Sequence, residues 1–90
     1  MKINTGFIKR FIADQYVVVA VGEAADVFSG LVYLNESSSL LWDRLLSGAS
    51  VEDLVSVLVD TYDVSQDVAS ADVMDFISEL NAIHAIDHEQ

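Results

Sequence analysis

The sequence contains neither cysteine nor proline. Without cysteine the chain has no disulfide, no thiolate-bound metal, no iron–sulfur cluster and no cysteine nucleophile, as is typical of a protein kept in a reducing compartment. Without proline it has no rigid linker and no proline-rich docking tract. The 90 residues, of which 52% are hydrophobic, therefore predict a single domain, residues 1–90, that folds on its apolar core alone.

Basic residues are scarce. The chain has only four, Lys2, Lys9, Arg10 and Arg44, and five acidic residues accompany them in the first half. Residues 46–90 carry ten acidic residues and no lysine or arginine. Nucleic-acid binding needs cations to replace the phosphate counterions, so no nucleic-acid partner is expected. The acidity fits either an ordinary solvated surface or a preference for a basic or neutral partner.

No apolar run is long enough to cross a membrane. The basic residues near the N-terminus and the apolar stretch after them resemble a secretion signal, but Asp14 and Gln15 interrupt it. Only residues 16–21 are continuously apolar, far fewer than the roughly 20 residues of a spanning helix. We therefore expect a cytoplasmic protein with no membrane partner.

The first part of the sequence predicts strands. Residues 7–12 alternate in part, and residues 16–21 contain four valines. The connection Ala13-Asp14-Gln15 predicts a hairpin between them. Residues 22–29 predict an irregular segment, and residues 31–34 a third strand. No connection among these strands is long enough for a crossover helix, so an antiparallel sheet is expected.

The remainder predicts three helices, capped by Asn35, Ser50 and Ser65, with Gly48 ending the first. The first helix has an apolar stripe of Leu41, Trp42, Leu45 and Leu46. The second has a stripe of Leu54, Val55, Leu58 and Tyr62. The third has a stripe of Val68 or Ala69, Val73, Phe76, Ile77, Leu80 and Ile83. Residues 84–90 predict a short strand or a frayed tail. The fold class is therefore α+β, with three strands followed by three helices.

No catalytic or metal-binding pattern is found in the sequence. His84 and His88 are four residues apart, but surface histidines explain them better than a metal site. The serine run Ser37-Ser38-Ser39 lacks the Gly-x-Ser-x-Gly turn of a nucleophile, and helix capping explains it more simply. We expect no enzyme activity and no cofactor.

The third strand is the strongest candidate for function. If Val32 and Leu34 point into the core, Leu31 and Tyr33 point away from it. An aromatic residue such as Tyr33 is then either strand filler or a contact for something that lies along the sheet. A small sheet also leaves an edge with unpaired backbone groups.

Three features resemble the coenzyme PQQ synthesis protein D family, over roughly residues 7–86. They are the pattern Leu-Asn-x-x-(small)-x-x-Leu-Trp at residues 34–42, the helix break at Ser47-Gly48 and the turn Tyr62-Asp63-Val64. The chain departs from the family near its end, where Ile83-His84-Ala85-Ile86 lacks the usual glycine.

The resemblance implies a winged-helix-like fold and a non-catalytic peptide chaperone. Family members bind the leader of a ribosomally made precursor peptide and present it to a modifying enzyme, often a radical S-adenosylmethionine enzyme. The leader adds as a strand to the third strand, opposite the third helix. Carried over by position, the edge is Gly30, Leu31, Val32, Tyr33 and Leu34, and the opposite wall is Val68, Ala69, Asp72, Val73 and Phe76. The charges of Asp72 and Asp75 suggest selection of a basic leader residue.

Other functions remain open at this point. A winged-helix DNA-binding protein would need a basic recognition helix, and the three helices contain only Arg44. An acidic carrier protein would attach its arm at Ser39, but Ser38 stands where the usual aspartate would be, and strands are foreign to carriers. A regulatory module acting alone as a small scaffold is a third alternative. The same exposed edge could also pair two copies of the chain into a homodimer.

Overall fold

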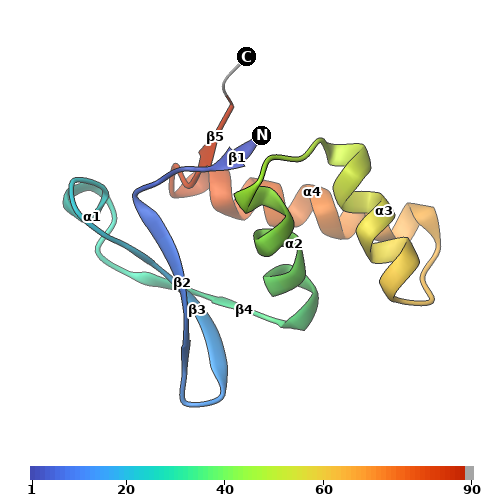
Figure 1. The fold of residues 1–90 in the computed structure, drawn as a ribbon, viewed down its shortest axis with the longest axis horizontal. Coiled ribbons are helices and arrows are strands. Elements are labelled where there is room, and N and C mark those ends of the chain that lie inside the picture. Colours follow the sequence, from blue (N-terminus) through green and yellow to red (C-terminus); the bar gives the residue numbers. More distant parts are fainter. Residues whose placement is uncertain (89–90) are drawn as a thin grey trace.

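The computed structural model describes residues 1–88 and places nine elements along them (Figure 1). The strands are β1 (Lys2–Ile3), β2 (Phe7–Ile12), β3 (Gln15–Ala20), β4 (Leu31–Leu34) and β5 (Ile86–Asp87). The helices are α1 (Ala24–Val27), α2 (Glu36–Leu46), α3 (Val51–Thr61) and α4 (Gln66–Ala82). The predicted order of three antiparallel strands and three longer helices is confirmed, in a winged-helix-like α+β arrangement.

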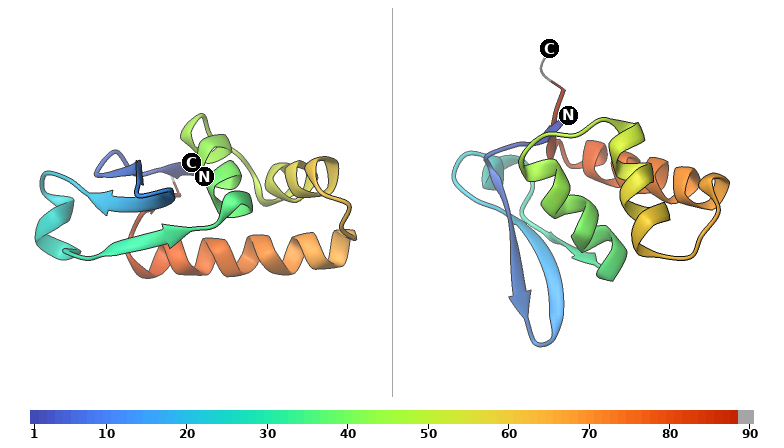
Figure 2. Two further views of the ribbon diagram at one scale, coloured as in Figure 1. Left: turned by 90° about the horizontal axis from the view of Figure 1, so that it is seen from below. Right: turned by 45° about the vertical axis from the view of Figure 1, so that its right-hand side comes forward.

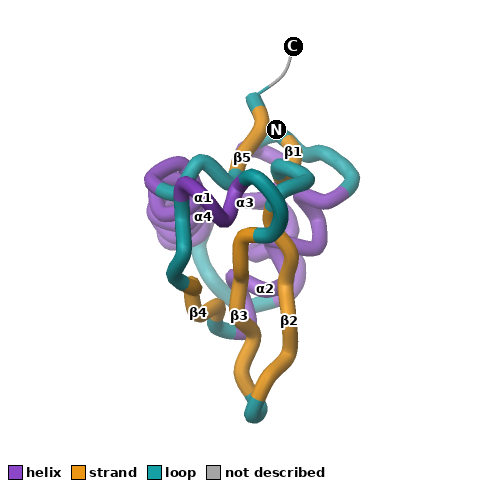
Figure 3. Tube along the Cα trace, turned by 90° about the vertical axis from the view of Figure 1, so that its left-hand side faces the viewer, coloured by secondary structure: helices purple, strands orange, loops and turns teal. Residues whose placement is uncertain are grey.

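The sheet is antiparallel, with strand order β2-β3-β4. Figure 3 shows its strands in front and the long helices behind them. In β3, Val18 faces the core and pairs with Lys9 on β2 and Val32 on β4. Neighbouring Val17 pairs with Arg10 and Tyr33 on the outer face. Val17 is only 3% exposed although it lies outside the core cluster, so its neighbours on the outer face bury it.

The hairpin turn is tighter than predicted. Ala13 and Asp14 alone form it, with φ values of 52° and 65°, while Gln15 already belongs to β3 and pairs with Ile12. Two successive residues with positive φ are characteristic of a type I′ turn, whose twist matches that of the strands. The prediction of Gln15 as a loop residue was wrong because alanine is unusual at the first position of such a turn, so nothing in the sequence indicated a two-residue loop.

Two short elements, α1 and β1, were not predicted. The short helix α1 lies inside the segment that was expected to be irregular. Strand β1 pairs with β5 through Lys2 with Asp87 and Ile3 with Ile86, so the two ends of the described chain meet, as Figure 1 shows. This pairing confirms the short strand near Ile86. The last two residues of the predicted tail, 89–90, lie outside the described residues.

Each long helix begins at its predicted cap. The side chains of Asn35, Ser50 and Ser65 accept from backbone N–H groups in the first turns of α2, α3 and α4. At the far end of α2, Gly48 has a φ of 93°, a left-handed conformation that glycine adopts without strain. The same left-handed conformation follows α4 at His84, with a φ of 61°.

One core joins the sheet to the helices. Trp42, Leu45 and Leu54 are almost fully buried at its centre. The predicted stripes are largely confirmed, and Ala69 rather than Val68 faces inward from α4. Leu46 was predicted wrongly, since 54% of its surface is exposed at the end of α2. No helix within residues 1–88 meets the length and hydropathy needed to span a bilayer.

Candidate functional site

The backbone of β4 has hydrogen-bonding groups on a free side. In a two-residue hairpin the two residues that flank the turn, here Ile12 and Gln15, form two backbone hydrogen bonds with each other. From there along the two strands, hydrogen-bonded residue pairs alternate with pairs that are not hydrogen-bonded. This alternation turns the N–H and C=O groups of Tyr16 and Val18 toward β4 and those of Val32 and Leu34 toward β3. The corresponding groups of Leu31 and Tyr33 point to the opposite side, where no strand pairs with β4 within residues 1–88.

The side chains of β4 divide as the sequence predicted. Leu34 is buried and Val32 half-buried against the core. Leu31 and Tyr33 are 47% and 65% exposed. The two residues whose backbone groups are free are therefore also the two whose side chains are exposed. Gly30 precedes them, beside the ring of Phe28.

A network around Lys9 fixes α2 relative to the sheet. The Lys9 ammonium donates to Asp43 Oδ1 at 2.6 Å and to Ser39 Oγ at 2.7 Å. It also lies 4.8 Å from the centre of the Tyr16 ring. Because α2 begins two residues after β4 ends, this network also fixes the direction in which the chain leaves β4.

The serines Ser37, Ser38 and Ser39 were predicted to cap the start of a helix, and they do not all have that role. Asn35 is the cap, and its Oδ1 accepts from the Ser38 N–H at 2.8 Å and from Ser37 Oγ at 3.0 Å. Ser39 is 6% exposed and accepts from Lys9. The interpretation of the serines as capping residues is therefore wrong for Ser39, whose partner lies on β2. Burial of the Ser39 hydroxyl also argues against its use as the attachment point of a carrier protein.

Two hollows lie between the start of α2 and the middle of α4. We call them the first and second hollow, with volumes of about 300 and 190 Å³. They share Asn35, Ser37, Leu58 and Asp72 as lining. Since Asn35 directly follows Leu34, the hollows begin where β4 ends. In the left view of Figure 2, β4 and α4 run along the same side of the molecule.

Acidic side chains line both hollows, beside a mainly apolar surface in the first and a mainly polar surface in the second. The first has Leu58 and Val64 in its lining together with the carboxylates of Glu36 and Asp72. The second is lined by Leu41, Leu58 and Phe76 and by the acidic residues Asp72, Asp75 and Glu79. We call Asp72, Asp75 and Glu79 the acidic stripe. Spacings of three and four residues place them along one face of α4. The ion pairs found within residues 1–88 join Lys9 to Asp43 and Arg44 to Asp53, so neither involves the acidic stripe.

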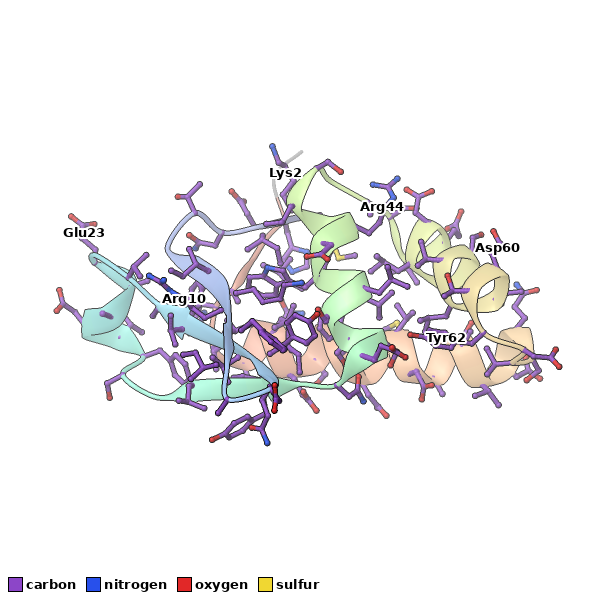
Figure 4. The ribbon with its side chains drawn as sticks, turned by 60° about the horizontal axis from the view of Figure 1, so that its bottom comes forward. Lys2, Arg10, Glu23, Arg44, Asp60 and Tyr62 are labelled. Atoms are coloured by element: carbon purple, nitrogen blue, oxygen red, sulfur yellow. The ribbon has the colours of Figure 1, made fainter. Side chains whose placement is uncertain are left out.

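Tyr62 closes one side of the first hollow, and Figure 4 labels it between α3 and α4. Its hydroxyl donates to Glu36 Oε2 at 3.4 Å. Desolvation, followed by the nearby Glu36 carboxylate, raises the pKa of the Tyr62 phenol above its ordinary value. The Tyr62 hydroxyl thus donates to a carboxylate that lines the same hollow.

The structure brings only part of the predicted wall to the surface. Asp72 lines both hollows, and Phe76, although only 4% exposed, lines the second. Ala69 and Val73 are fully buried and support the wall from behind. Val68 is 50% exposed one turn before Asp72 and lines neither hollow.

The sequence prediction missed nine residues that line the hollows: Asn35, Glu36, Ser37, Ser38, Leu41, Leu58, Tyr62, Val64 and Glu79. Glu79 was detectable, because it continues the spacing of Asp72 and Asp75 along α4. Leu58 and Tyr62 come from α3, and their meeting with α4 depends on the packing of the two helices. Within the described residues, no group of three histidine, cysteine or acidic side chains is placed to hold a metal ion.

Comparisons with known proteins agree with this geometry. The model of the coenzyme PQQ synthesis protein D family matches residues 15–86. The chain belongs to this family. The matched residues run from β3 through β4 and the long helices to the start of β5, and thus include both the free edge and the two hollows.

Two solved structures have the same fold. One is described as TbiB1 in complex with the TbiA(beta) leader peptide, with 21% identity, a TM-score of 0.79, and 100% of this chain and 99% of that chain covered. The other is lasso peptide synthetase B1 complexed with the leader peptide, with 21% identity, a TM-score of 0.72, and 90% and 89% covered. At this identity the likeness concerns the fold. The comparison with curated proteins found no match.

Proposed function

We propose that the chain is a non-catalytic recognition protein that binds the leader of a ribosomally made precursor peptide by strand addition to β4. The observation that carries this proposal is the free side of β4, where the backbone groups of Leu31 and Tyr33 are available and their side chains are exposed. A peptide strand there would extend the β2-β3-β4 sheet, with main-chain hydrogen bonds supplying affinity and side-chain contacts supplying specificity. The similar folds are described with leader peptides bound, which supports the same role here.

The opposite side of the peptide would face α4. Asp72 and Phe76 would contact it directly, with Ala69 and Val73 holding them in place. Val68 would extend this contact by one helical turn. Gly30 and Leu34 would mark the two ends of the paired segment, with Val32 anchoring it to the core.

The partner enzyme and the compartment are part of the proposal. Membership in the family favours presentation of the leader to a radical S-adenosylmethionine enzyme. The similar structure described as lasso peptide synthetase B1 makes a lasso-peptide enzyme the second candidate. Absence of cysteine favours action in the cytoplasm. Self-pairing through β4 into a homodimer would compete with leader binding, so leader addition should dissociate such a dimer.

A proline scan of β4 tests the mode of binding. Leu31→Pro removes a backbone N–H that points to the free side, at the first position of an edge strand, where proline is tolerated. Leu31→Ala removes the side chain but keeps the N–H. With labelled leader segments from precursor peptides encoded beside the gene, Leu31→Pro should lose at least about tenfold more affinity than Leu31→Ala, since the new residue also displaces the peptide backbone.

Backbone NMR of the same titration locates the peptide. Leader addition should shift the amide signals of residues 31–34 and of the facing part of α4. Equal affinity of the Leu31→Pro and Leu31→Ala variants, or shifts confined to α1 and the outer side of α3, would overturn strand addition at β4. Circular dichroism of both variants establishes that the fold is retained.

A further inference from the structure

The two hollows suggest which leaders the protein selects. Each is lined by apolar side chains together with carboxylates, among them Leu58 and Glu36 in the first and Phe76 and Asp75 in the second. Lysine and arginine have the complementary shape, because their methylene stems lie on apolar surface while their charged heads reach a polar rim. An acidic or purely apolar side chain would leave the carboxylates without partners.

The charge around the hollows is of one sign. The acidic stripe has no ion-pair partner within residues 1–88, and the second half of the sequence contains no lysine or arginine. Lys9 and Arg44 form ion pairs with other carboxylates, those of Asp43 and Asp53 respectively. The carboxylates of the acidic stripe therefore remain available to a cation of a bound molecule.

The spacing of the acidic stripe fits an extended peptide. Helical rise places Asp75 and Glu79 about 6 Å apart along α4, and Asp72 and Glu79 roughly 10 Å apart. In a strand, alternate side chains lie on the same face about 6.6 Å apart. Two alternate leader side chains that face α4 would therefore reach successive parts of the acidic stripe.

We propose that the protein selects leaders with basic residues at two alternate positions, i and i+2, whose side chains occupy the two hollows. The residue between them faces the other side of the sheet, beside Leu31 and Tyr33, and is therefore apolar. The signature is basic–apolar–basic. This inference rests on the proposed strand addition at β4 and assigns the substrate class of that site.

Selection from a random peptide library tests the signature. Displayed random nonapeptides are selected on the immobilised full chain, and the enriched pool is counter-screened against the Leu31→Pro variant. Peptides that bind the wild-type chain, lose binding to Leu31→Pro and carry lysine or arginine at i and i+2 with an apolar residue between them support the inference. Peptides that depend on Leu31 in the same way but lack this spacing overturn the inference and leave strand addition intact. A pool that binds the Leu31→Pro variant as well as it binds the wild-type chain overturns strand addition and the inference with it. A selection that enriches no peptide does the same.

A charge-matched pair of variants assigns the effect to the acidic stripe. The double variant Asp75→Asn, Glu79→Gln should bind an enriched basic peptide about three- to tenfold more weakly, as expected for the loss of two partly exposed ion pairs. Asp60→Asn with Asp67→Asn changes the net charge equally at acidic residues outside the second hollow and should change the affinity by less than about twofold. Asp60 is labelled in Figure 4, on α3 away from β4. Equal losses in both double variants would show that only net charge matters and would overturn the role of the acidic stripe.

Discussion

Lys9 Nζ lies 2.6 Å from Asp43 Oδ1 and joins β2 to α2. The Lys9 side chain is only 17% exposed, and its ammonium also donates to the buried Ser39 hydroxyl. The contact spans 34 positions of sequence, and β4 lies within that span. The ion pair is therefore part of the support that sets β4 at the edge of the sheet.

Lys9→Met should destabilise the fold by about 1–3 kcal/mol. Methionine keeps much of the apolar stem, but the Ser39 hydroxyl loses its donor and Asp43 loses its cation. Urea unfolding followed by circular dichroism measures the change. Arg10→Met is the matched control, because Arg10 is exposed on the other face of the sheet, and it should cost no more than about 0.5 kcal/mol. Equal effects of the two variants would contradict a specific role for the Lys9 network.

His84→Gly should stabilise the protein by about 0.5–1 kcal/mol. His84 has a φ of 61° after α4, a conformation that is strained for residues with a Cβ atom and easy for glycine. Its backbone bonds, from the His84 N–H to Asn81 O and from the Ala85 N–H to Leu80 O, are retained in the variant. Thermal unfolding gives the readout. Ala82→Gly, two residues earlier and still helical, should be destabilising, and the opposite signs separate the conformational effect from a general effect of glycine.

The helices could be predicted from the sequence because their signals are local. Asn35, Ser50 and Ser65 are strong caps, and each helix begins directly after its cap. The exposure of Leu31 and Tyr33 followed from simple alternation once residues 31–34 were assigned to a strand. The edge of the candidate site was therefore accessible from the sequence.

The hollows could not be predicted in the same way. Leu58 lies in the apolar stripe of α3, and nothing in its neighbourhood distinguishes a core residue from the floor of a hollow. Its role depends on the distance between α2 and α4. Likewise, the burial of Ser39 follows from Lys9 reaching across from β2, a contact with no local sequence signal. Strand β1 is only two residues long and exists because β5 pairs with it.

Gly6→Ala should destabilise the protein, and Ala24→Gly should relieve much of that loss. A Cβ atom at Gly6 would lie 2.6 Å from the Cβ of Ala24 in α1, closer than the two atoms can approach. Overpacking of this kind costs about 1–3 kcal/mol. In a double-mutant cycle read by urea unfolding, the double variant should be more stable than the sum of the single changes predicts. Additive effects would show that the segment around α1 moves freely enough to absorb the new methyl group.

Asp53→Asn should destabilise the protein at neutral pH but not in acid. The Ser50 N–H donates to Asp53 Oδ2 at 3.0 Å, and Ser50 Oγ accepts from the Asp53 N–H at 3.1 Å, forming a capping box at the start of α3. The backbone bond from Ser50, the side-chain contact with Ser50 and the charge of Arg44 lower the pKa of Asp53 from its ordinary 3.8.

The sign of the pH dependence follows from this lowered pKa. The unfolded chain binds the Asp53 proton at a higher pH than the folded chain does, so the stabilisation is fully present above the ordinary pKa and is lost as the pH falls through the folded value. The difference in melting temperature between wild type and Asp53→Asn should therefore be constant above about pH 5 and shrink in more acidic solution. Asp60→Asn, near the other end of α3, should instead raise the melting temperature at neutral pH, because a carboxylate is unfavourable near a helix C-terminus. If the difference in melting temperature between wild type and Asp53→Asn did not depend on pH, the variant would have lost packing or hydrogen-bond geometry rather than charge. The negative charge of Asp53 would then have no role in the capping box.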